Sequence, residues 1–204
     1  MVKLNYKEYC LDIPDNVYLP SEDTYLLLET IQEDIKNKVI DSSLEIGVGS
    51  GYISLGLYNQ VNNMKVTDIN PLVIDYIKDL KQKYNLNKLK VIKSNLFKNI
   101  KEKYDLIIFN PPYVPSESIP KENELERLAT DGGSFGRKII LSFLIDLNKH
   151  LSKDGVCYLL ISSFNNPHYI FKQILKNNLN YKVLSEKNIF FERLIILKIT
   201  IKGK

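Results

Sequence analysis

The chain has 204 residues, of which 44% are apolar and 25% are charged, and this composition suits one globular domain with a sizeable core. No run of residues is apolar for long enough to cross a membrane, and the first ten residues lack the apolar core of a signal peptide. The formal charge of +4 comes from lysines scattered along the chain, so it is weak evidence for nucleic-acid binding.

Strand patterns alternate with helix patterns along the chain. Strands are predicted at 43–47, 64–68, 89–93, 104–109, 156–162, 180–186 and 193–201, and helices at 21–36, 51–60, 71–85, 137–151 and 167–178. Repeated strand–helix units predict a parallel sheet with right-handed crossovers. The gap between the last two strands is too short for a crossover helix, so these strands should pair antiparallel. We therefore expect a doubly wound α/β fold, with a mostly parallel seven-stranded sheet and one antiparallel strand.

The first predicted helix follows an N-terminal leader, and leader and helix together cover about residues 1–38. Ser21 is expected to cap this helix, with acidic residues in its first turn and Thr24 at its third position. Neither a repeat nor a linker interrupts the chain, so one domain over residues 1–204 is expected.

A glycine-rich turn ends the first predicted strand of the sheet. Gly47, Gly49 and Gly51 follow Glu45 in a G-x-G-x-G spacing, which lets the backbone come close to a ligand. The spacing is neither the dinucleotide fingerprint nor a phosphate-binding P-loop. The alternative is a plain strand-to-helix turn. Nothing basic lies near these glycines, so a pyrophosphate is not expected, and S-adenosylmethionine fits better than NAD.

Polar residues at the next strand ends raise the likelihood of a nucleoside site. Asp68 ends the second strand, where its two oxygens suit the vicinal hydroxyls of a ribose; the alternative is an Asx turn. Asn95 can read the edge of an adenine while Leu96 covers a ring face, although a turn asparagine explains Asn95 equally well. Glu45 is placed to bind the amino group of a methionine moiety. The alternative is that it contacts a loop or the end of a helix.

The tetrapeptide after the fourth strand, Asn110-Pro111-Pro112-Tyr113, carries the strongest chemical signal. An amide or exocyclic amine nitrogen is a poor nucleophile because its lone pair is delocalised. The Asn110 oxygen can accept one N–H and the Pro111 carbonyl the other, while the prolines hold both acceptors rigid. Tyr113 offers a flat face for stacking. This arrangement predicts methylation of a planar nitrogen, against the alternative of a proline-rich loop that caps a strand.

The glycine turn, the acidic strand end and the NPPY tetrapeptide together resemble the class I amino-methyltransferases. Two further segments, 17–28 (VYLPSEDTYLLL) and 131–137 (DGGSFGR), resemble the small eukaryotic and archaeal HemK-like enzymes. The resemblance runs from about residue 17 to the end of the chain. It implies methylation of the glutamine in the GGQ motif of class I release factors.

The resemblance also assigns roles to individual residues. It implies cofactor contacts from Thr24, Glu45, Gly47, Asp68, Asn95, Leu96 and Asn110, with Asn110 also touching substrate. Asn95 departs from the family, which commonly carries Asp there. The resemblance further implies a partner, the small zinc-binding activator Trm112. The third predicted strand, at residues 89–93, should lie at an edge of the sheet, where such a partner can add a strand.

Two other functions compete with this hypothesis. An adenine-N6 methyltransferase acting on DNA or RNA would need a basic cleft or an added target-reading module, and the long loop at 114–128 has four glutamates and only two basic residues. A non-enzymatic subunit would carry a broken glycine turn or lack NPPY, and both are intact here.

The few histidines and cysteines limit what metal or disulfide chemistry the chain can carry. With two histidines and two distant cysteines, Cys10 and Cys157, no metal site is expected. The cysteines are expected to be reduced thiols of a cytoplasmic protein.

Overall fold

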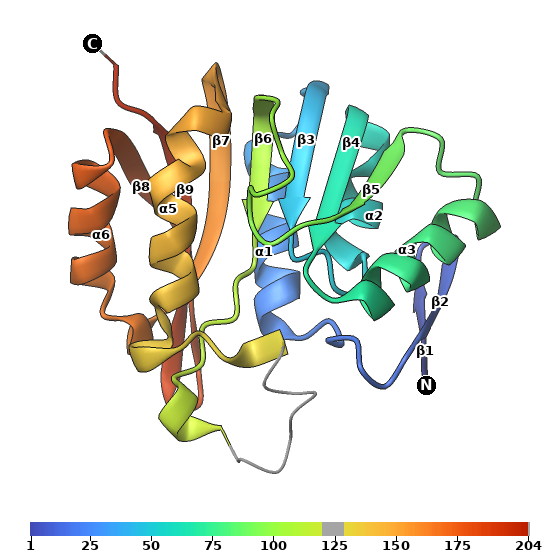
Figure 1. Cartoon of the computed structure of the whole chain (residues 1–204), viewed down its shortest axis with the longest axis horizontal. Coiled ribbons are helices and arrows are strands. Elements are labelled where there is room, and N and C mark those ends of the chain that lie inside the picture. Colours follow the sequence, from blue (N-terminus) through green and yellow to red (C-terminus); the bar gives the residue numbers. More distant parts are fainter. Residues whose placement is uncertain (120–128, 204) are drawn as a thin grey trace.

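In the computed structural model, which describes residues 1–119 and 129–203, a seven-stranded sheet forms the centre of the chain (Figure 1). Its order is β5-β4-β3-β6-β7-β9-β8. The strands are β3 (Ile40–Ile46), β4 (Val61–Asp68), β5 (Leu89–Lys93), β6 (Tyr104–Phe109), β7 (Leu151–Ser162), β8 (Leu179–Ile189) and β9 (Glu192–Ile201). Strand β9 runs antiparallel to both of its neighbours, β7 and β8, so it points opposite to the other six strands. The predicted fold class, the seven strands and the edge position of residues 89–93 are confirmed. Residues 120–128 of the predicted long loop lie outside the described residues.

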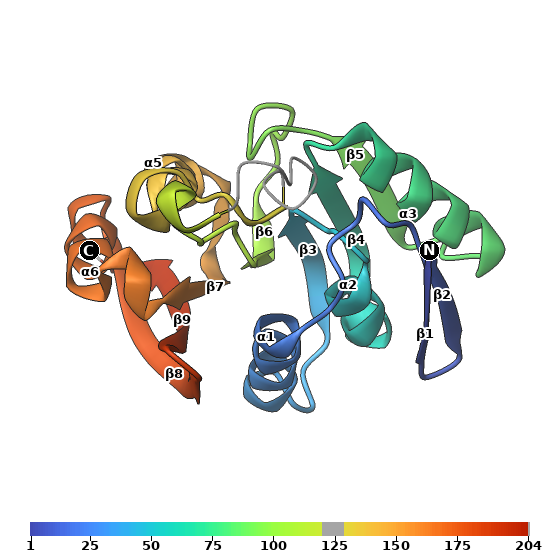
Figure 2. The same cartoon turned by 90° about the horizontal axis from the view of Figure 1, so that it is seen from below.

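Helices cover both faces of this sheet (Figures 1 and 2). The described helices are α1 (Glu22–Asp34), α2 (Tyr52–Leu57), α3 (Pro71–Lys83), α5 (Lys138–His150) and α6 (Pro167–Lys176). Side chains of α1, α2 and α3 belong to one hydrophobic cluster, and those of α5 and α6 belong to another. Along β6, Leu106 and Ile108 join the first cluster while Ile107 and Phe109 join the second. This central strand is therefore buried on both faces, as its apolar sequence predicts.

The carboxyl ends of the parallel strands meet at one edge of the sheet. Ile46 of β3 lies in register with Thr67 of β4 and with Phe109 of β6. The residues directly after these three positions are the glycine turn, Asp68 and Asn110. Sheet register thus brings together three segments that are about 20 or more residues apart in the sequence, at the edge where open α/β sheets bind ligands.

Two helix starts differ in how they are capped. Asn70 caps α3 by accepting from the backbone N–H of Leu72 at 3.0 Å, and Pro71 is the first residue of that helix, as predicted. Ser21 is the N-cap residue of α1, but its side chain makes no capping hydrogen bond. Instead, the Ser21 hydroxyl donates to the Asp23 carboxylate at 2.7 Å. The predicted position of the cap is therefore right, while its hydrogen bond goes elsewhere.

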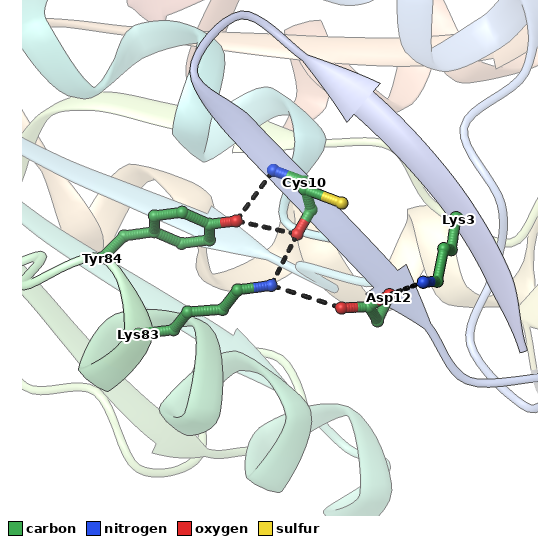
Figure 3. Close-up of polar contacts among 5 residues, drawn as sticks. All are labelled: Lys3, Cys10, Asp12, Lys83 and Tyr84. Atoms are coloured by element: carbon green, nitrogen blue, oxygen red, sulfur yellow. Dashed lines mark hydrogen bonds and ion pairs between the residues drawn. The ribbon is translucent and has the colours of Figure 1, made fainter.

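The leader contains a hairpin that sequence patterns did not predict. Strands β1 (Val2–Tyr6) and β2 (Tyr9–Ile13) pair antiparallel in a separate two-stranded sheet. The hairpin lies against the end of α3, where the Tyr84 hydroxyl contacts both the N–H and the carbonyl of Cys10 at 2.8 Å (Figure 3). Lys83 donates to the Cys10 carbonyl and pairs with Asp12. The turn between β1 and β2 contains neither glycine nor asparagine, and Lys7 in it has φ +52°. The usual sequence signal of a hairpin is therefore missing.

No helix in the described part of the chain has both the length and the apolar character needed to span a membrane.

Candidate active site

A cavity of about 970 Å³ lies at the carboxyl edge of the sheet. It is bordered by the start of α1 and by the segments that follow β3, β4, β5 and β6. Its size falls within the range of small-molecule and cofactor sites. Ten of the predicted site residues line it: Thr24, Glu45, Gly47, Gly49, Asp68, Asn95, Leu96, Asn110, Pro111 and Tyr113. Gly51, which the sequence groups with the cofactor contacts, is not part of this lining.

The glycine turn adopts backbone angles that favour glycine. Gly47 and Gly49 have φ values of +68° and +50°, in the left-handed region. Gly51 has φ +78°, and a Cβ atom there would come within 2.9 Å of the Ile77 side chain on α3. The first two glycines therefore bring bare backbone to the cavity, whereas the third lets α2 and α3 pack together.

Asp68 forms an Asx turn and also lines the cavity. Its carboxylate accepts from the N–H of Asn70 at 2.9 Å, which is an Asx turn, and from the N–H of Gly49 at 3.2 Å. The carboxylate also lines the cavity, and burial raises its pKa. Each carboxylate oxygen has two lone pairs, so one backbone bond per oxygen leaves acceptor capacity for two hydroxyls. The turn therefore fixes the position of the acid and leaves it able to accept from a ligand.

Glu45 is a buried carboxyl group on the cavity wall. It is 3% exposed, and the Ser54 hydroxyl on α2 donates to it. Burial raises the pKa of Glu45 to about 8, against the opposing effect of the hydrogen bond from Ser54. A cation bound next to Glu45 would favour its ionised form.

Asn95 stands on the cavity rim in a tight turn after β5. Its side chain is exposed, and Leu96 has φ +47°. The buried Ser94 stabilises this turn by donating to the Leu96 carbonyl at 2.9 Å and by accepting from the N–H of Asn99. Asn95 is thus a turn residue that also borders the cavity, so the two interpretations of it are compatible.

Asn110 lines the cavity and carries an acceptor atom without a partner. Its Nδ2 donates to Asp23 Oδ2 at 3.1 Å. Its Oδ1 is buried and, among the described residues, is the one buried side-chain polar atom without a hydrogen-bond partner. A carboxylate can only accept, so the Asn110 side chain must turn its NH2 group toward Asp23 and its oxygen away from it. An unsatisfied buried oxygen is unfavourable in itself, so this atom on a cavity residue can accept from a donor that binds there.

Asp23 is a functional candidate that sequence analysis did not single out. It is 2% exposed, and it accepts from the Tyr18 hydroxyl at 3.0 Å and from the Tyr113 hydroxyl at 3.5 Å, besides Asn110. Burial, followed by the charge of Asp23, raises the pKa of both tyrosines, so both hydroxyls remain protonated donors. In the sequence, Asp23 resembles any acid in the first turn of a helix, which is why it escaped notice.

The segment 131–137 packs against the backbone of the NPPY loop at Tyr113. A Cβ atom on Gly136 would lie 1.9 Å from the Tyr113 carbonyl oxygen, so only glycine allows this approach. The Asn165 amide donates to that same carbonyl at 2.8 Å and to the Gly136 carbonyl at 2.9 Å. Asn165 was not predicted, because it lies in the 3-10 turn after β7, more than 50 residues from Tyr113.

In the described part of the chain, no group of three or more histidine, cysteine or acidic residues is placed to hold a metal ion.

The sheet order, the glycine turn and the acids around this cavity define a class I methyltransferase that uses S-adenosylmethionine. A family model described as the methyltransferase small domain matches residues 21–191. The chain belongs to this family and is an S-adenosylmethionine-dependent N-methyltransferase.

Known relatives cover almost the whole chain. It is 33% identical to a putative protein N5-glutamine methyltransferase of Methanocaldococcus jannaschii, over 92% of this chain and 93% of that one. It is 30% identical to the methyltransferase HEMK2 of Homo sapiens, over 91% and 90% of the two chains. Among solved structures, the E. cuniculi Mtq2–Trm112 complex, described as responsible for methylation of the termination factor eRF1, has the same fold. Its TM-score is 0.70 at 24% identity, over 91% of this chain and 99% of that one.

Proposed function

We propose that this enzyme transfers a methyl group to the side-chain amide nitrogen of the glutamine in the GGQ motif of a class I release factor. The observation that carries the proposal is the buried, unpartnered Oδ1 of Asn110 at the cavity, held in place by Asp23. An amide N–H is the donor that such an oxygen lacks. Relatives named as glutamine methyltransferases and the eRF1-methylating complex with the same fold support this substrate.

The cofactor would lie along the glycine turn and the ends of β4 and β5. Asp68 would accept the ribose hydroxyls, Glu45 would face the amino group, and Asn95 with Leu96 would border the adenine. Gly47 and Gly49 would allow close backbone approach, and Thr24 would contact the cofactor from α1. When bound, S-adenosylmethionine supplies an electrophilic methyl group. The cavity volume and this set of acceptors fit such a ligand.

At the substrate end, the residues of the chain orient the nitrogen. Asn110 Oδ1 accepts one N–H of the amide, the Pro111 carbonyl accepts the other, and Tyr113 provides a face for stacking. Tyr113 stays protonated, because burial and the nearby Asp23 raise its pKa, so it does not act as a base. No strong base is required, since the nitrogen becomes acidic only as the new bond forms, and its proton leaves late.

An exocyclic amine of a nucleic acid would present the same kind of nitrogen. Such a substrate also brings phosphates, which require cationic contacts. Among the described residues that line the cavity, Lys138 is the only basic one. The site therefore favours a protein amide.

We also propose that the enzyme works as a single domain, in the cytoplasm, with a Trm112-like zinc-binding subunit. The support is the fold similarity to a chain that is complexed with Trm112. The edge strand β5 adds to this, because Val91 and Ile92 are only partly buried and β4 is its one described neighbour in the sheet. Co-expression with a Trm112-like protein should give one co-eluting species with higher activity than the chain alone. A monodisperse and fully active lone chain would argue against this partner.

Methyl transfer from labelled cofactor to a purified release factor tests the proposed substrate. Label should appear in the wild-type factor and be absent from a factor with Gln→Ala in GGQ. Asn110→Ala should lower the turnover number by about two to three orders of magnitude while cofactor binding changes little. Equal labelling of both factors, or labelling of nucleic acid instead, would reject the substrate.

A further inference from the structure

Four exposed phenylalanines gather on loops at the edge of the sheet that carries the cavity. Their exposed fractions are 60% for Phe135, 50% for Phe164, 100% for Phe190 and 95% for Phe191. No other phenylalanine among the described residues is exposed. We call these four residues the aromatic rim. Clustered exposed aromatic side chains mark interaction surfaces, because water solvates them poorly.

Hydrogen bonds connect the loops of the aromatic rim to one another. The backbone N–H of Arg193, close to the turn between β8 and β9, donates to the Ser163 hydroxyl next to Phe164 at 3.0 Å. The Asn165 amide donates to the Phe135 carbonyl at 3.5 Å. Phe135, Phe164 and the Phe190–Phe191 turn therefore lie on adjacent loops at one edge of the sheet.

This surface is joined to the substrate end of the cavity. Lys187 of β8 forms an ion pair with Glu22, the neighbour of Asp23 at the start of α1. Glu192, which follows Phe191, accepts from the Ser162 hydroxyl at 2.6 Å. The charge of Glu192 also contributes, after burial and Asp23, to the raised pKa of Tyr113. The end of the hairpin therefore contacts the start of α1 and the end of β7, on the side of Asp23 rather than of the glycine turn.

The Phe190–Phe191 turn is unfavourable for a free hairpin. Phe190 has φ +43°, a left-handed angle that favours glycine or asparagine, and two-residue hairpin turns are usually Asn-Gly or Asp-Gly. Two aromatic side chains at this position weaken the turn and expose apolar surface together. Local strain of this kind is typical of binding and catalytic sites.

We propose that the aromatic rim is the docking surface for the folded protein whose glutamine enters the cavity, an inference that rests on the proposed function. The reacting glutamine is a small part of a folded protein, so affinity for that protein must come mostly from the surface around the cavity. Exposed aromatic residues supply most of the binding energy in such interfaces. Two of the nearby cations, Lys187 and Arg193, are paired with Glu22 and Glu186, and Arg137 packs over the rings of Phe135 and Tyr169. Among its described residues, the surface is therefore mainly aromatic, with few unpaired charges, which favours a protein over a polyanion as the occupant.

A turn replacement tests the docking surface without loosening the hairpin. Phe190→Asn combined with Phe191→Gly removes both rings and introduces a favourable turn sequence, so the melting temperature should stay equal or rise. Val39→Ser is the matched control, because Val39 is 72% exposed directly before β3, at the opposite edge of the sheet. The assays compare the intact release factor with a short peptide that carries its GGQ motif. If the chain alone methylates the factor, it is used alone; otherwise it is used together with its activator.

The double variant should raise KM for the intact factor about tenfold or more, with kcat and the affinity for S-adenosylhomocysteine unchanged. Any activity toward the peptide should be the same in variant and wild type, and the control should behave as wild type throughout. An unchanged KM for the intact factor, an equal loss on the peptide, or loss of the activator subunit from the complex would overturn the docking surface. A wild-type enzyme that methylates neither factor nor peptide would instead reject the proposed function.

Discussion

Asp23→Asn is expected to lower turnover while leaving the cofactor end of the site intact. In the wild type, both oxygens of Asp23 accept, and Oδ2 faces the Asn110 amide at 3.1 Å. The substituted side chain has the same shape, but one of its oxygens becomes an NH2 group. The other carboxylate oxygen, Oδ1, accepts from the backbone N–H of Thr24 at 2.6 Å, so the remaining oxygen of the variant will face Thr24. The new NH2 then faces Asn110, whose amide must rotate and point its own NH2 into the cavity.

The size of this effect follows from the lost hydrogen bond. A hydrogen bond to a charged group contributes about 1.5–3 kcal/mol, and Asp23 is buried, so solvent screens it little. Without this hydrogen bond, the amide of Asn110 is no longer held with its oxygen toward the substrate. At about 1.4 kcal/mol for each factor of ten, this loss lowers kcat by about tenfold to 150-fold. Asn110→Ala removes the acceptor outright, so its larger loss is the upper limit.

The assay measures kcat and KM with a release factor, together with calorimetry using S-adenosylhomocysteine and thermal unfolding. Asp34→Asn is the matched control, because Asp34 lies on the same helix and accepts from Tyr158 and Lys198, away from the cavity. The control should lose stability while its kcat stays close to that of the wild type. If folded Asp23→Asn protein keeps the wild-type kcat, or loses activity only through weaker cofactor binding, the orienting role of Asp23 is refuted.

Four other outcomes are expected. Asp68→Ala should weaken S-adenosylhomocysteine binding by about tenfold or more, because charge-assisted bonds of about 1.5–3 kcal/mol each are lost; calorimetry that shows unchanged affinity in a folded variant would reject the ribose contact. Since the pKa of Glu45 is raised to about 8, binding of a cationic amino group beside it should release a proton, so affinity should increase from pH 6 to 8 and level off above about 8. Glu45→Gln should remove that pH dependence, and a slope that persists in the variant would point to another group. Gly136→Ala should displace the NPPY loop and lower both kcat and melting temperature, since its Cβ would lie 1.9 Å from a carbonyl oxygen; wild-type values for both would show that the loop tolerates the shift. Asn95→Asp should keep or improve affinity for S-adenosylhomocysteine, because the acid accepts more strongly from an adenine amino group, and a large drop would show that the amide donor of Asn95 matters.

Much of the fold could be predicted because its signals are local. Each strand of the large sheet contains a short run rich in apolar residues, and the helices between them show a regular apolar spacing. The full lengths of β7 and β8, 12 and 11 residues, exceed the predicted ranges 156–162 and 180–186, because their added ends are mostly polar. The closely spaced last strands required antiparallel pairing, which the structure confirms. The N-terminal hairpin was missed, because its turn lacks glycine and asparagine and its burial depends on Tyr84, about 70 residues away.

The sequence by itself determined the residue types of the site, since the glycine turn, Asp68 and the NPPY tetrapeptide each lie at the end of a predicted strand. The register of the parallel strands then brings them to one edge. Only the tertiary structure showed that Gly51 serves the packing of α2 on α3, that Asn165 and Gly136 hold Tyr113, and that Asp23 sets the orientation of Asn110. These contacts join residues 23 to 87 positions apart, and no local pattern encodes them. A buried carboxylate in the first turn of a helix has the same sequence signature as an exposed one, and only packing distinguishes the two.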